Sequence, residues 1–245
     1  MDRAELTLAA SLHALVKNQA SITNNIANAQ SVGYRRRAGT FIPFENQLEK
    51  AAGIKLTTPL YREFGDFSQG RIQQTEDRFN IALQGEGFFQ VRRPGESGKT
   101  YFTRVGTLKV DPNGTLLTGE GMELLSAQGT PIRISTGAAF KVDSKGEIQD
   151  LHTGEVLGQI GLWKFQNPTN LRPLGAGLFE PTPSAGTPAR DRFTTVSQGS
   201  LESSNVDTMQ ELVGMITVQR HFQSVTRALS VVEQTADRLN QLAQG

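Results

Sequence analysis

Apolar residues near the N-terminus recur at alternating steps of four and three, which is the pattern of a helix that packs along one side. The stripe lies between about residues 2 and 30, with Gln19 at the one seam position that is not apolar. Its apolar members are Leu8, Leu12, Leu15, Ile22, Ile26 and Ala29. Ser31-Val32-Gly33 follows, and glycine commonly accepts the left-handed conformation after a helix. We therefore expect an N-terminal helix that ends before Gly33.

A second stripe with the same spacing follows Val206 and continues to the C-terminus. One heptad row contains Met215, Phe222, Leu229 and Ala236, and the other contains Val218, Val225, Val232 and Leu239. Ser204 with Asp207 three residues later has the form of a capping box, which predicts a helix start near Ser204 or Asn205. The preceding residues 198–201 are typical of a linker.

Between the two stripes the sequence changes to short alternating runs separated by glycine-containing turns, which is typical of an all-β domain. The predicted strands lie at 79–83, 87–91, 101–105 and 159–165. Segments 109–114 and 141–146 resemble each other, and both predict a strand, a type I turn and a left-handed glycine. A calcium loop is an alternative for the first segment, but the second has Lys145 where a ligand would lie.

Two stretches look irregular, and they complete the predicted organisation. Residues 35–75 suggest an extended arm, and residues 167–190, which are rich in Pro and Gly, suggest a surface loop. The expected fold class is α+β, with N- and C-terminal helices pairing as a coiled-coil-like α domain beside a central all-β domain. The predicted limits are 1–34 for the N-terminal helical part, 35–75 for the arm, 76–197 for the β domain and 198–245 for the linker and C-terminal helix.

The terminal helices are expected to need partners. Burial of roughly half a dozen seam residues does not offset the entropy lost when about 25 residues become ordered. Pairing within the chain closes a very long loop, although the cost of closure rises only slowly with loop length. Further burial against neighbouring subunits would favour the ordered state. The termini are therefore candidates for folding on assembly, mobile and sensitive to protease in the dilute monomer.

Composition removes several function classes. Lys and Arg total 25 against 24 Asp and Glu, so a net charge of +1 gives no field that would attract nucleic acid or an acidic membrane. The chain has no cysteine, which removes disulfides, thiolate metal sites and thiol nucleophiles. No basic segment is followed by a continuous apolar run, so neither a cleavable secretory signal nor membrane insertion is expected.

The sequence contains few candidates for catalytic or metal-binding residues. Phosphate-binding, dinucleotide-binding, nucleophile-elbow and zinc-protease motifs are all absent from the sequence. His13, His152 and His221 lie in three different regions, so we expect no metal and no other cofactor. Glu147 and Asp150 could act as a glycosidase pair, but the separation of their carboxylates is not contained in the sequence. An enzyme is therefore the least favoured class.

Two further features allow a binding role. Arg35-Arg36-Arg37 could contact phosphate or a membrane, although a solvated or intersubunit cluster is the favoured interpretation. Trp163, with Leu162 and Phe165, could form an exposed binding strip, although a β-domain core explains these residues more simply. A binding module that uses its β domain remains the alternative to a structural protein.

Three segments carry a resemblance to a known family. Residues 21–35, Ser-Ile-Thr-Asn-Asn-Ile-Ala-Asn-Ala-Gln-Ser-Val-Gly-Tyr-Arg, closely resemble the N-terminal signature of flagellar rod, hook and hook-associated proteins. Helix propensity does not explain three asparagines within five positions. Residues 199–207 and the segment after them resemble the family's C-terminal signature. The middle segments 85–89, 101–106 and 111–114 resemble the β domain of rod members. Ser31-Val32 and Tyr34 depart from the commonest pattern.

The resemblance implies a structural subunit of the bacterial flagellar basal-body rod, of the proximal or the distal type. Such a subunit would assemble into the axial tube that transmits torque from motor to hook. It would leave the cell through the flagellar type III export apparatus without a cleavable signal and form part of the periplasm-spanning rod. Its partners would be copies of itself, neighbouring rod and hook subunits and the export apparatus, with no nucleic acid and no small-molecule substrate. The alternative becomes a scaffold or binding module of the cell envelope.

The expected assembly interface combines the seams with the signature residues. The signature asparagines either donate amide hydrogen bonds between subunits or lie on a solvated face near a helix end. The sequence leaves both possibilities open. The full expected set is Leu8, Leu12, Leu15, Ile22, Asn24, Asn25, Ile26, Asn28, Gly33, Asn205, Met215, Val218, Phe222, Val225, Leu229, Val232 and Leu239.

Overall fold

The computed structural model describes residues 3–45, 57–96, 98–135 and 137–243. The chain divides into two compact units, and each gathers segments that are far apart in sequence. Unit 1 consists of residues 1–27, 37–64 and 207–245, and unit 2 consists of residues 28–36 and 65–206. Unit 1 contains the long helices and unit 2 is mostly β, so the predicted α+β class is confirmed.

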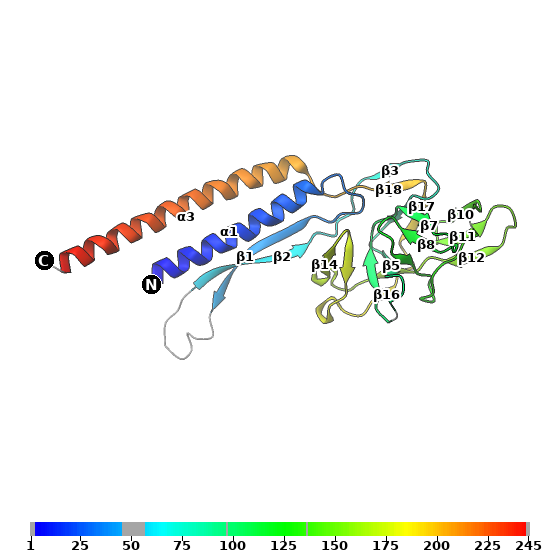
Figure 1. Cartoon of the computed structure of the whole chain (residues 1–245), viewed down its shortest axis with the longest axis horizontal. Coiled ribbons are helices and arrows are strands. Elements are labelled where there is room, and N and C mark those ends of the chain that lie inside the picture. The colour runs from blue at the N-terminus through cyan, green and yellow to red at the C-terminus, as the bar shows by residue number, and fades with distance from the viewer. Residues whose placement is uncertain (1–2, 46–56, 97, 136, 244–245) are drawn as a thin grey trace. The chain divides into compact units, whose positions relative to one another are not determined.

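In unit 1, two long helices lie side by side, as Figure 1 shows for α1 (Arg3–Ala27) and α3 (Thr208–Ala243). Leu15, Ile22 and Val218 are buried between these helices. Half-buried residues pack around them, namely Ile26, Met215, Phe222 and Val225. The two predicted stripes therefore share one apolar cluster.

The start of α3 differs from the prediction. The helix begins at Thr208, and Asp207 caps it, because its Oδ1 accepts hydrogen bonds from the N–H groups of Met209 (2.9 Å) and Gln210 (3.2 Å). Ser204 Oγ instead accepts from the N–H of Val206 at 3.2 Å. The capping-box prediction was wrong because Asp207, which was expected at the third helical position, is itself the N-cap.

Two strands lie within the stretch 35–75 that was expected to be an irregular, extended arm. β1 (Arg37–Glu45) pairs with β2 (Thr57–Gly65) in a two-stranded sheet, and β1 contacts α1. Each strand contains a proline, which concealed it in the sequence; a two-stranded sheet tolerates proline because each strand has a free edge. Gly39 gives room to the ring of Tyr61, since a Cβ there would lie 2.1 Å from Tyr61 Cζ.

Unit 2 consists of short strands. The largest sheet has the order β14-β15-β6-β5-β9-β8-β7, with β13 pairing both β5 and β16. The smaller sheets are β10-β11-β12, β17-β4 and β18-β3. The strands are β3 (Ile72–Gln74), β4 (Ile81–Gln84), β5 (Phe88–Arg92), β6 (Tyr101–Thr103), β7 (Leu108–Val110), β8 (Leu116–Thr118), β9 (Glu123–Leu124), β10 (Phe140–Val142), β11 (Glu147–Asp150), β12 (Val156–Gln159), β13 (Leu162–Lys164), β14 (Arg172–Gly175), β15 (Leu178–Glu180), β16 (Ala189–Arg190), β17 (Thr195–Gln198) and β18 (Ser200–Glu202).

The core of unit 2 has two parts. The larger cluster contains fully buried aliphatic and aromatic residues such as Ile81, Leu116 and Ile148. The smaller one is rich in phenylalanine, and the rings of Phe102 and Phe165 meet edge to face at 4.8 Å between centroids. The alternating runs predicted as strands supply much of both clusters.

The two similar segments form hairpins as predicted. Asp111 Oδ1 accepts from the N–H groups of Asn113 (2.9 Å) and Thr115 (2.6 Å), and Asp143 Oδ1 does the same in the second copy. Gly114 and Gly146 adopt φ values of +81° and +79°. Each carboxylate thus closes its own turn, which favours the turn interpretation over the calcium loop.

Two segments of unit 2 are more regular than the sequence suggested. The predicted surface loop at 167–190 contains the β14–β15 pair and two 3-10 turns, η1 (Pro168–Asn170) and η2 (Pro183–Ala185). Pro168 and Pro183 start the two 3-10 turns, and Pro173 lies in β14, an edge strand, where proline is tolerated. The predicted linker at 198–201 is the tight connection between β17 and β18, with Gln198 ending β17 and residues 200 and 201 in β18, which pairs with β3.

Candidate assembly site

Seven of the predicted seam residues lie in the apolar cluster where α1 and α3 meet inside unit 1. Leu15, Ile22 and Val218 are buried, with exposed fractions of 8%, 7% and 6%. The half-buried members are Leu8, Leu12, Ile26, Met215, Phe222, Val225, Leu229 and Val232, and the side chain of Leu239 lies outside the described residues. Most of the apolar surface of both stripes is therefore used within one chain.

Asn25 joins three elements of unit 1. Its Nδ2 donates to the carbonyl of Arg37 (2.8 Å) and to Glu211 Oε2 (3.1 Å), and its Oδ1 accepts from the N–H of Arg37 (2.8 Å). Asn25 is fully buried and Glu211 is 2% exposed. Its amide thus bonds β1 as a backbone group would and holds α3 through a carboxylate. Asn25 is therefore neither solvated nor available for a contact with another subunit.

The other two signature asparagines have local contacts. Asn24 is exposed, and its Nδ2 donates to the carbonyl of Ala20 at 2.9 Å. Asn28 is half-buried, and its Oδ1 accepts from Ser31 Oγ at 3.1 Å in the turn after α1. Of the three signature asparagines, Asn24 is the one that lies on an exposed face of α1.

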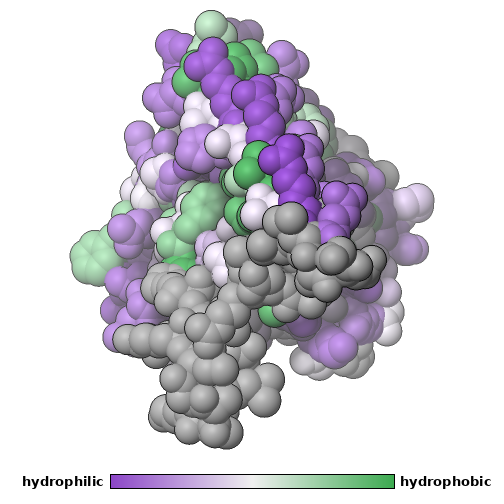
Figure 2. All heavy atoms as spheres, turned by 90° about the vertical axis from the view of Figure 1, so that its left-hand side faces the viewer, coloured by the Kyte–Doolittle hydropathy of each residue, from purple (hydrophilic) through white to green (hydrophobic). Residues whose placement is uncertain are grey.

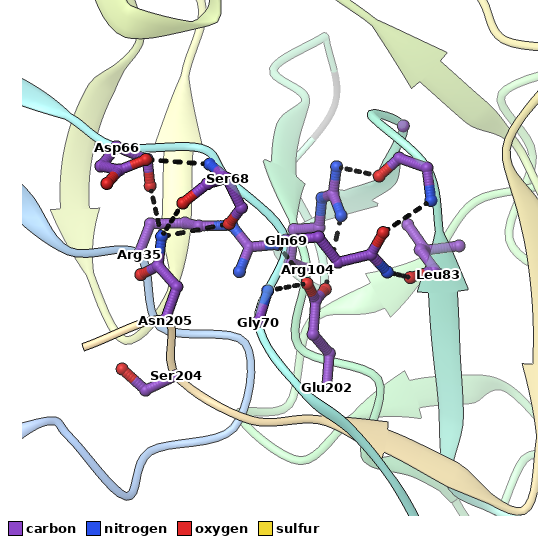
Figure 3. A network of polar contacts seen from close by, with 12 residues as sticks. Arg35, Asp66, Ser68, Gln69, Gly70, Leu83, Arg104, Glu202, Ser204 and Asn205 are labelled. Atoms are coloured by element: carbon purple, nitrogen blue, oxygen red, sulfur yellow. Dashed lines mark hydrogen bonds and ion pairs between the residues drawn. The ribbon is translucent and has the colours of Figure 1, made fainter. Parts of the chain in front are cut away.

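Asn205 has an equivalent role in unit 2. Its Oδ1 accepts from the N–H of Arg36 at 2.7 Å, and its Nδ2 donates to the carbonyls of Asp66 and Ser68 at 2.9 and 3.1 Å. One amide therefore fixes the three segments that contain Arg36, Asp66 to Ser68 and Asn205 itself. Figure 3 shows its contacts with Asp66 and Ser68. Gly33 lies in the first segment with φ +65°, as expected, and its N–H donates to the carbonyl of Glu202 at 2.7 Å.

A buried ion cluster adjoins Asn205. Glu202 Oε1 lies 2.7 Å from Arg35 Nη2, and Glu202 Oε2 lies 3.4 Å from Arg104 Nη1 (Figure 3). Glu202 also accepts from the N–H of Gly70, and Arg104 Nη2 donates to the carbonyl of Gly85 at 2.7 Å. The side chains of Arg35 and Glu202 are completely buried, so the prediction of a solvated or intersubunit arginine cluster was wrong for Arg35.

The cluster carries two positive charges and one negative charge. The pKa of Arg104 is lowered to about 10, mainly by burial and also by the charge of Arg35, and Glu202 partly offsets both effects. Arg104 also stacks over the ring of Phe88 at 5.1 Å. Arg35 Nε and Nη1 and Arg104 Nε have no hydrogen-bond partner. Glu202 is therefore the group on which both guanidinium ions depend.

The sequence could not identify Glu202, Arg104 and Glu211 as partners in these networks. Asn25 and Glu211 are separated by 186 positions, and Arg35 and Glu202 by 167. Glu202 and Arg104 do fall inside segments that resemble the family. A charged residue within an otherwise apolar strand segment, as at Tyr-Phe-Thr-Arg104-Val, is the one signal of burial that the sequence offered.

The chemical candidates do not converge. His13, His152 and His221 are exposed and lie on different elements. Glu147 and Asp150 begin and end β11, where positions three apart face opposite sides of a strand. In the described part of the chain, no group of three or more His, Cys, Asp or Glu side chains could hold a metal ion. Among the same residues, no helix has the length and hydropathy that a bilayer span requires.

The β face near Trp163 is partly exposed. Trp163 is half-buried against the phenylalanine cluster, with the guanidinium of Arg190 5.9 Å from its ring. Beside it, Phe193 is 86% exposed, with Lys164 Nζ 5.5 Å from its ring centroid. The backbone of Phe193 is fixed, because its N–H and that of Thr194 both donate to Asp191 Oδ1. This strip thus presents one aromatic ring to solvent.

Two family models match the chain. The C-terminal model described as "Flagellar basal body rod FlgEFG protein C-terminal" matches residues 197–242. The model described as "Flagellar hook protein FlgE/F/G D1 domain" matches residues 82–150. The first covers β18, Asn205 and most of α3, and the second covers β5 to β11.

Similar curated proteins extend this match over nearly the whole chain. The flagellar basal-body rod protein FlgG of Buchnera aphidicola (from Acyrthosiphon pisum) is 30% identical, covering 92% of this chain and 94% of its own length. The protein of the same name from Borreliella burgdorferi is 30% identical over 98% of this chain and 96% of its own. That from Bacillus subtilis is 31% identical over 89% and 90%. The two-unit chain with its paired terminal helices belongs to the family of flagellar basal-body rod proteins.

Proposed function

We propose that this protein is a structural subunit of the flagellar basal-body rod, which assembles with copies of itself and with neighbouring rod and hook subunits. The observation that carries the proposal is the similarity to rod proteins named FlgG over about nine-tenths or more of both chains. These relatives belong to a structural family and not to an enzyme family. The proposed site of action is the axial tube, where the subunit transmits torque from motor to hook.

The contacts of the described residues fit a mechanical part. Torque is transmitted only when the segments of a subunit cannot slide past one another. In unit 2, the amide of Asn205 and the carboxylate of Glu202 hold segments from both ends of the sequence. In unit 1, Asn25 joins α1 to β1 and α3. We propose that α1 and α3 pair as a coiled-coil-like α domain and that these polar contacts fix its register.

The finer parts of the proposal follow from the family. The subunit would reach the rod through the flagellar type III export apparatus, without a cleavable signal peptide. Its location would be the part of the basal body that spans the periplasm. Helices that gain order from neighbouring subunits would suit export of an unfolded chain followed by assembly.

A deletion strain tests the function directly. Removal of the gene should abolish swimming, and imaging of the basal bodies should show an axial structure that stops within the rod. Reintroduced wild-type protein should restore both. Normal rods in the deletion strain would contradict the proposal.

Seam variants test the role of the helices. Replacing Phe222 and Leu229 with Asp should prevent rod formation, because two charges would be placed against the apolar cluster of unit 1. Gln223→Asp, which adds a charge at an exposed neighbouring position, is the matched control and should swim normally. Circular dichroism and proteolysis should show that unit 2 remains folded. If the double variant still built rods, the helical pairing would not be required.

A second candidate function rests on the exposed ring of Phe193. A scaffold or binding module of the cell envelope would use such a fixed aromatic residue as an anchor. Phe193→Ala would then abolish function although the subunit still assembled into rods. In a purely structural subunit whose contacts lie on the helices, the same variant would swim like the wild type.

A further inference from the structure

A second apolar stripe lies on α3, on the side away from the seam. Met209, Leu212, Val213 and Ile216 follow the spacing i, i+3, i+4, i+7, so they share one face over the first two turns of the helix. Their exposed fractions are 72%, 44%, 64% and 52%. The seam residues Glu211, Met215 and Val218 alternate with them on the opposite face, so α1 of the same chain cannot cover the stripe.

The surface of unit 1 also carries a shallow groove, on the outward face of α1. Figure 2, which looks at the ends of the helices, shows hydrophobic residues in green between hydrophilic residues in purple, so apolar surface is not confined to the interior. The groove is lined by Val16, Gln19, Ala20, Thr23, Asn24 and Ala27. Val16, Ala20, Thr23 and Ala27 are exposed and follow steps of four and three, the spacing of a helix-packing face.

The stripe and the groove match in shape, and both are uncharged. The stripe consists of four large side chains, and the floor of the groove consists mainly of small ones, so the ridge of one fits the hollow of the other. Neither contains a charged residue, so no charge would lose its water when they meet. The polar members, Gln19 and Asn24, carry uncharged amides that can bond at the edge of a contact.

We infer that the α3 stripe of one copy docks into the α1 groove of a second copy. This inference rests on the proposed self-assembly and identifies the surfaces that carry it. Because the stripe and the groove are different surfaces, the contact is heterologous and repeats from copy to copy instead of closing into a two-fold dimer. Four partly exposed side chains offer far less than the roughly 800 Å² per partner of a stable pair. The contact therefore works through repetition in an assembly, and the free protein stays monomeric.

Cysteine cross-linking tests the contact, because the natural chain contains no cysteine. Ala20→Cys and Ile216→Cys are made as two single variants and expressed together in a strain that lacks the native gene. Oxidation of isolated basal bodies should then give a disulfide-linked dimer with one copy of each variant. Two control mixtures move one cysteine off the contact: Lys17→Cys with Ile216→Cys, and Ala20→Cys with Gln210→Cys. Both control positions are exposed on the same helices.

The expected result is a dimer band in the test mixture that is lost in both controls and in soluble monomer. An equal band from Ile216→Cys alone would show a symmetric contact between stripes and overturn the inference. A disulfide within a single chain that carries both cysteines would also overturn it, because the two surfaces would then meet in one molecule. The inference would also be overturned if the variants built rods and no mixture gave a cross-link.

A charge variant supplies an independent measurement. Val213→Glu should leave the circular dichroism and protease resistance of the soluble protein unchanged, because the side chain is exposed, and should abolish rod assembly. Gln210→Glu adds the same charge off the stripe and should assemble normally. If Val213→Glu assembles like the wild type, the stripe is not an interface. If the wild-type gene itself supports no rods, the proposed function fails instead, so the two failures are distinguishable.

Discussion

Asn24 and Asn25 are neighbours in one signature and have opposite environments. The amide of Asn25 is fully buried and makes three hydrogen bonds, whereas Asn24 is exposed and bonds back to its own helix. A signature in sequence therefore contains residues under different constraints. Asn25 is required by the fold of one chain, and Asn24 borders a surface that another chain can reach.

Asn25→Ala should destabilise unit 1 far more than Asn24→Ala. Loss of the Asn25 amide leaves the N–H and carbonyl of Arg37 and the carboxylate of Glu211 without this partner in a buried place, which costs about 2–4 kcal/mol. Asn24→Ala acts on the exposed face of α1, where the bond to the Ala20 carbonyl lies in solvent, and should change stability by less than about 0.5 kcal/mol. Urea denaturation followed by helix content would measure both. Equal effects would refute the assigned role of Asn25.

Glu202→Gln should be among the most damaging conservative substitutions in unit 2. It leaves Arg35 and Arg104 buried without the carboxylate that pairs with both, although the pKa of Arg104 is already lowered to about 10, mainly by burial. Breaking a buried ion pair on one side costs about 3–5 kcal/mol.

Glu123→Gln is the matched control for Glu202→Gln. Glu123 pairs with Arg92 at 2.7 Å, but both side chains are partly exposed, so its loss should cost about 1 kcal/mol or less. Chemical denaturation followed by tryptophan fluorescence reports on unit 2, because Trp163 lies there. If Glu202→Gln lowered the free energy of unfolding no more than Glu123→Gln does, water would have replaced the buried pair.

At the scale of elements, α3 has two working faces. One packs on α1 through Met215 and Val218, and the other presents Met209 and Ile216 to solvent. Heptad spacing predicted the first face because periodicity is local information. The second face lay within the same helix and was not recognised, since a search for one seam assigns every other position to solvent.

Gly214→Ala should stabilise α3 without disturbing the seam. Gly214 lies inside the helix, and a Cβ there would meet Ile22 Cδ1 at 3.5 Å, which is ordinary van der Waals contact. Alanine in place of glycine inside a helix contributes about 0.5–1 kcal/mol. A thermal melt followed by helix signal should shift upward. A downward shift would show that the helices need the glycine for close approach.

The strands show where sequence patterns stop being sufficient. The segments around Leu83, Val91 and Phe102 were predicted because alternation and turn residues agree there. β1, β2 and β14 were missed because each contains a proline, and only their edge positions make that proline harmless. The partners of Asn25 and Glu202 could not be predicted at all, because residues that distant in sequence meet only in the finished fold.

At the scale of the whole molecule, each unit has a core of its own. Unit 1 depends on a small cluster around Leu15, Ile22 and Val218, whereas unit 2 has a much larger buried core. Stability is therefore unevenly divided between them. This difference agrees with the expectation that helical ends gain order from neighbours, which remains a prediction.

Unfolding should occur in two steps, with unit 1 first. Val218→Ala removes two buried methyl groups and should lower the midpoint of the first step alone, at a cost of about 1–2 kcal/mol. Limited proteolysis of the monomer should remove α1 and α3 before it cuts the β strands. A single cooperative transition that Val218→Ala shifts as a whole would show that the two units unfold together.

The pairing of β4 with β17 has a consequence for the order of events during synthesis. Gln84 of β4 is opposite Thr195 of β17, 111 positions later. At roughly 5–20 residues per second, a ribosome needs about 5–20 s to make that interval. Throughout this time β4 presents an unpaired edge. β3 does so too, because its partner β18 is made later still. The nascent chain should therefore keep two strand edges exposed until the last fifth of the sequence emerges.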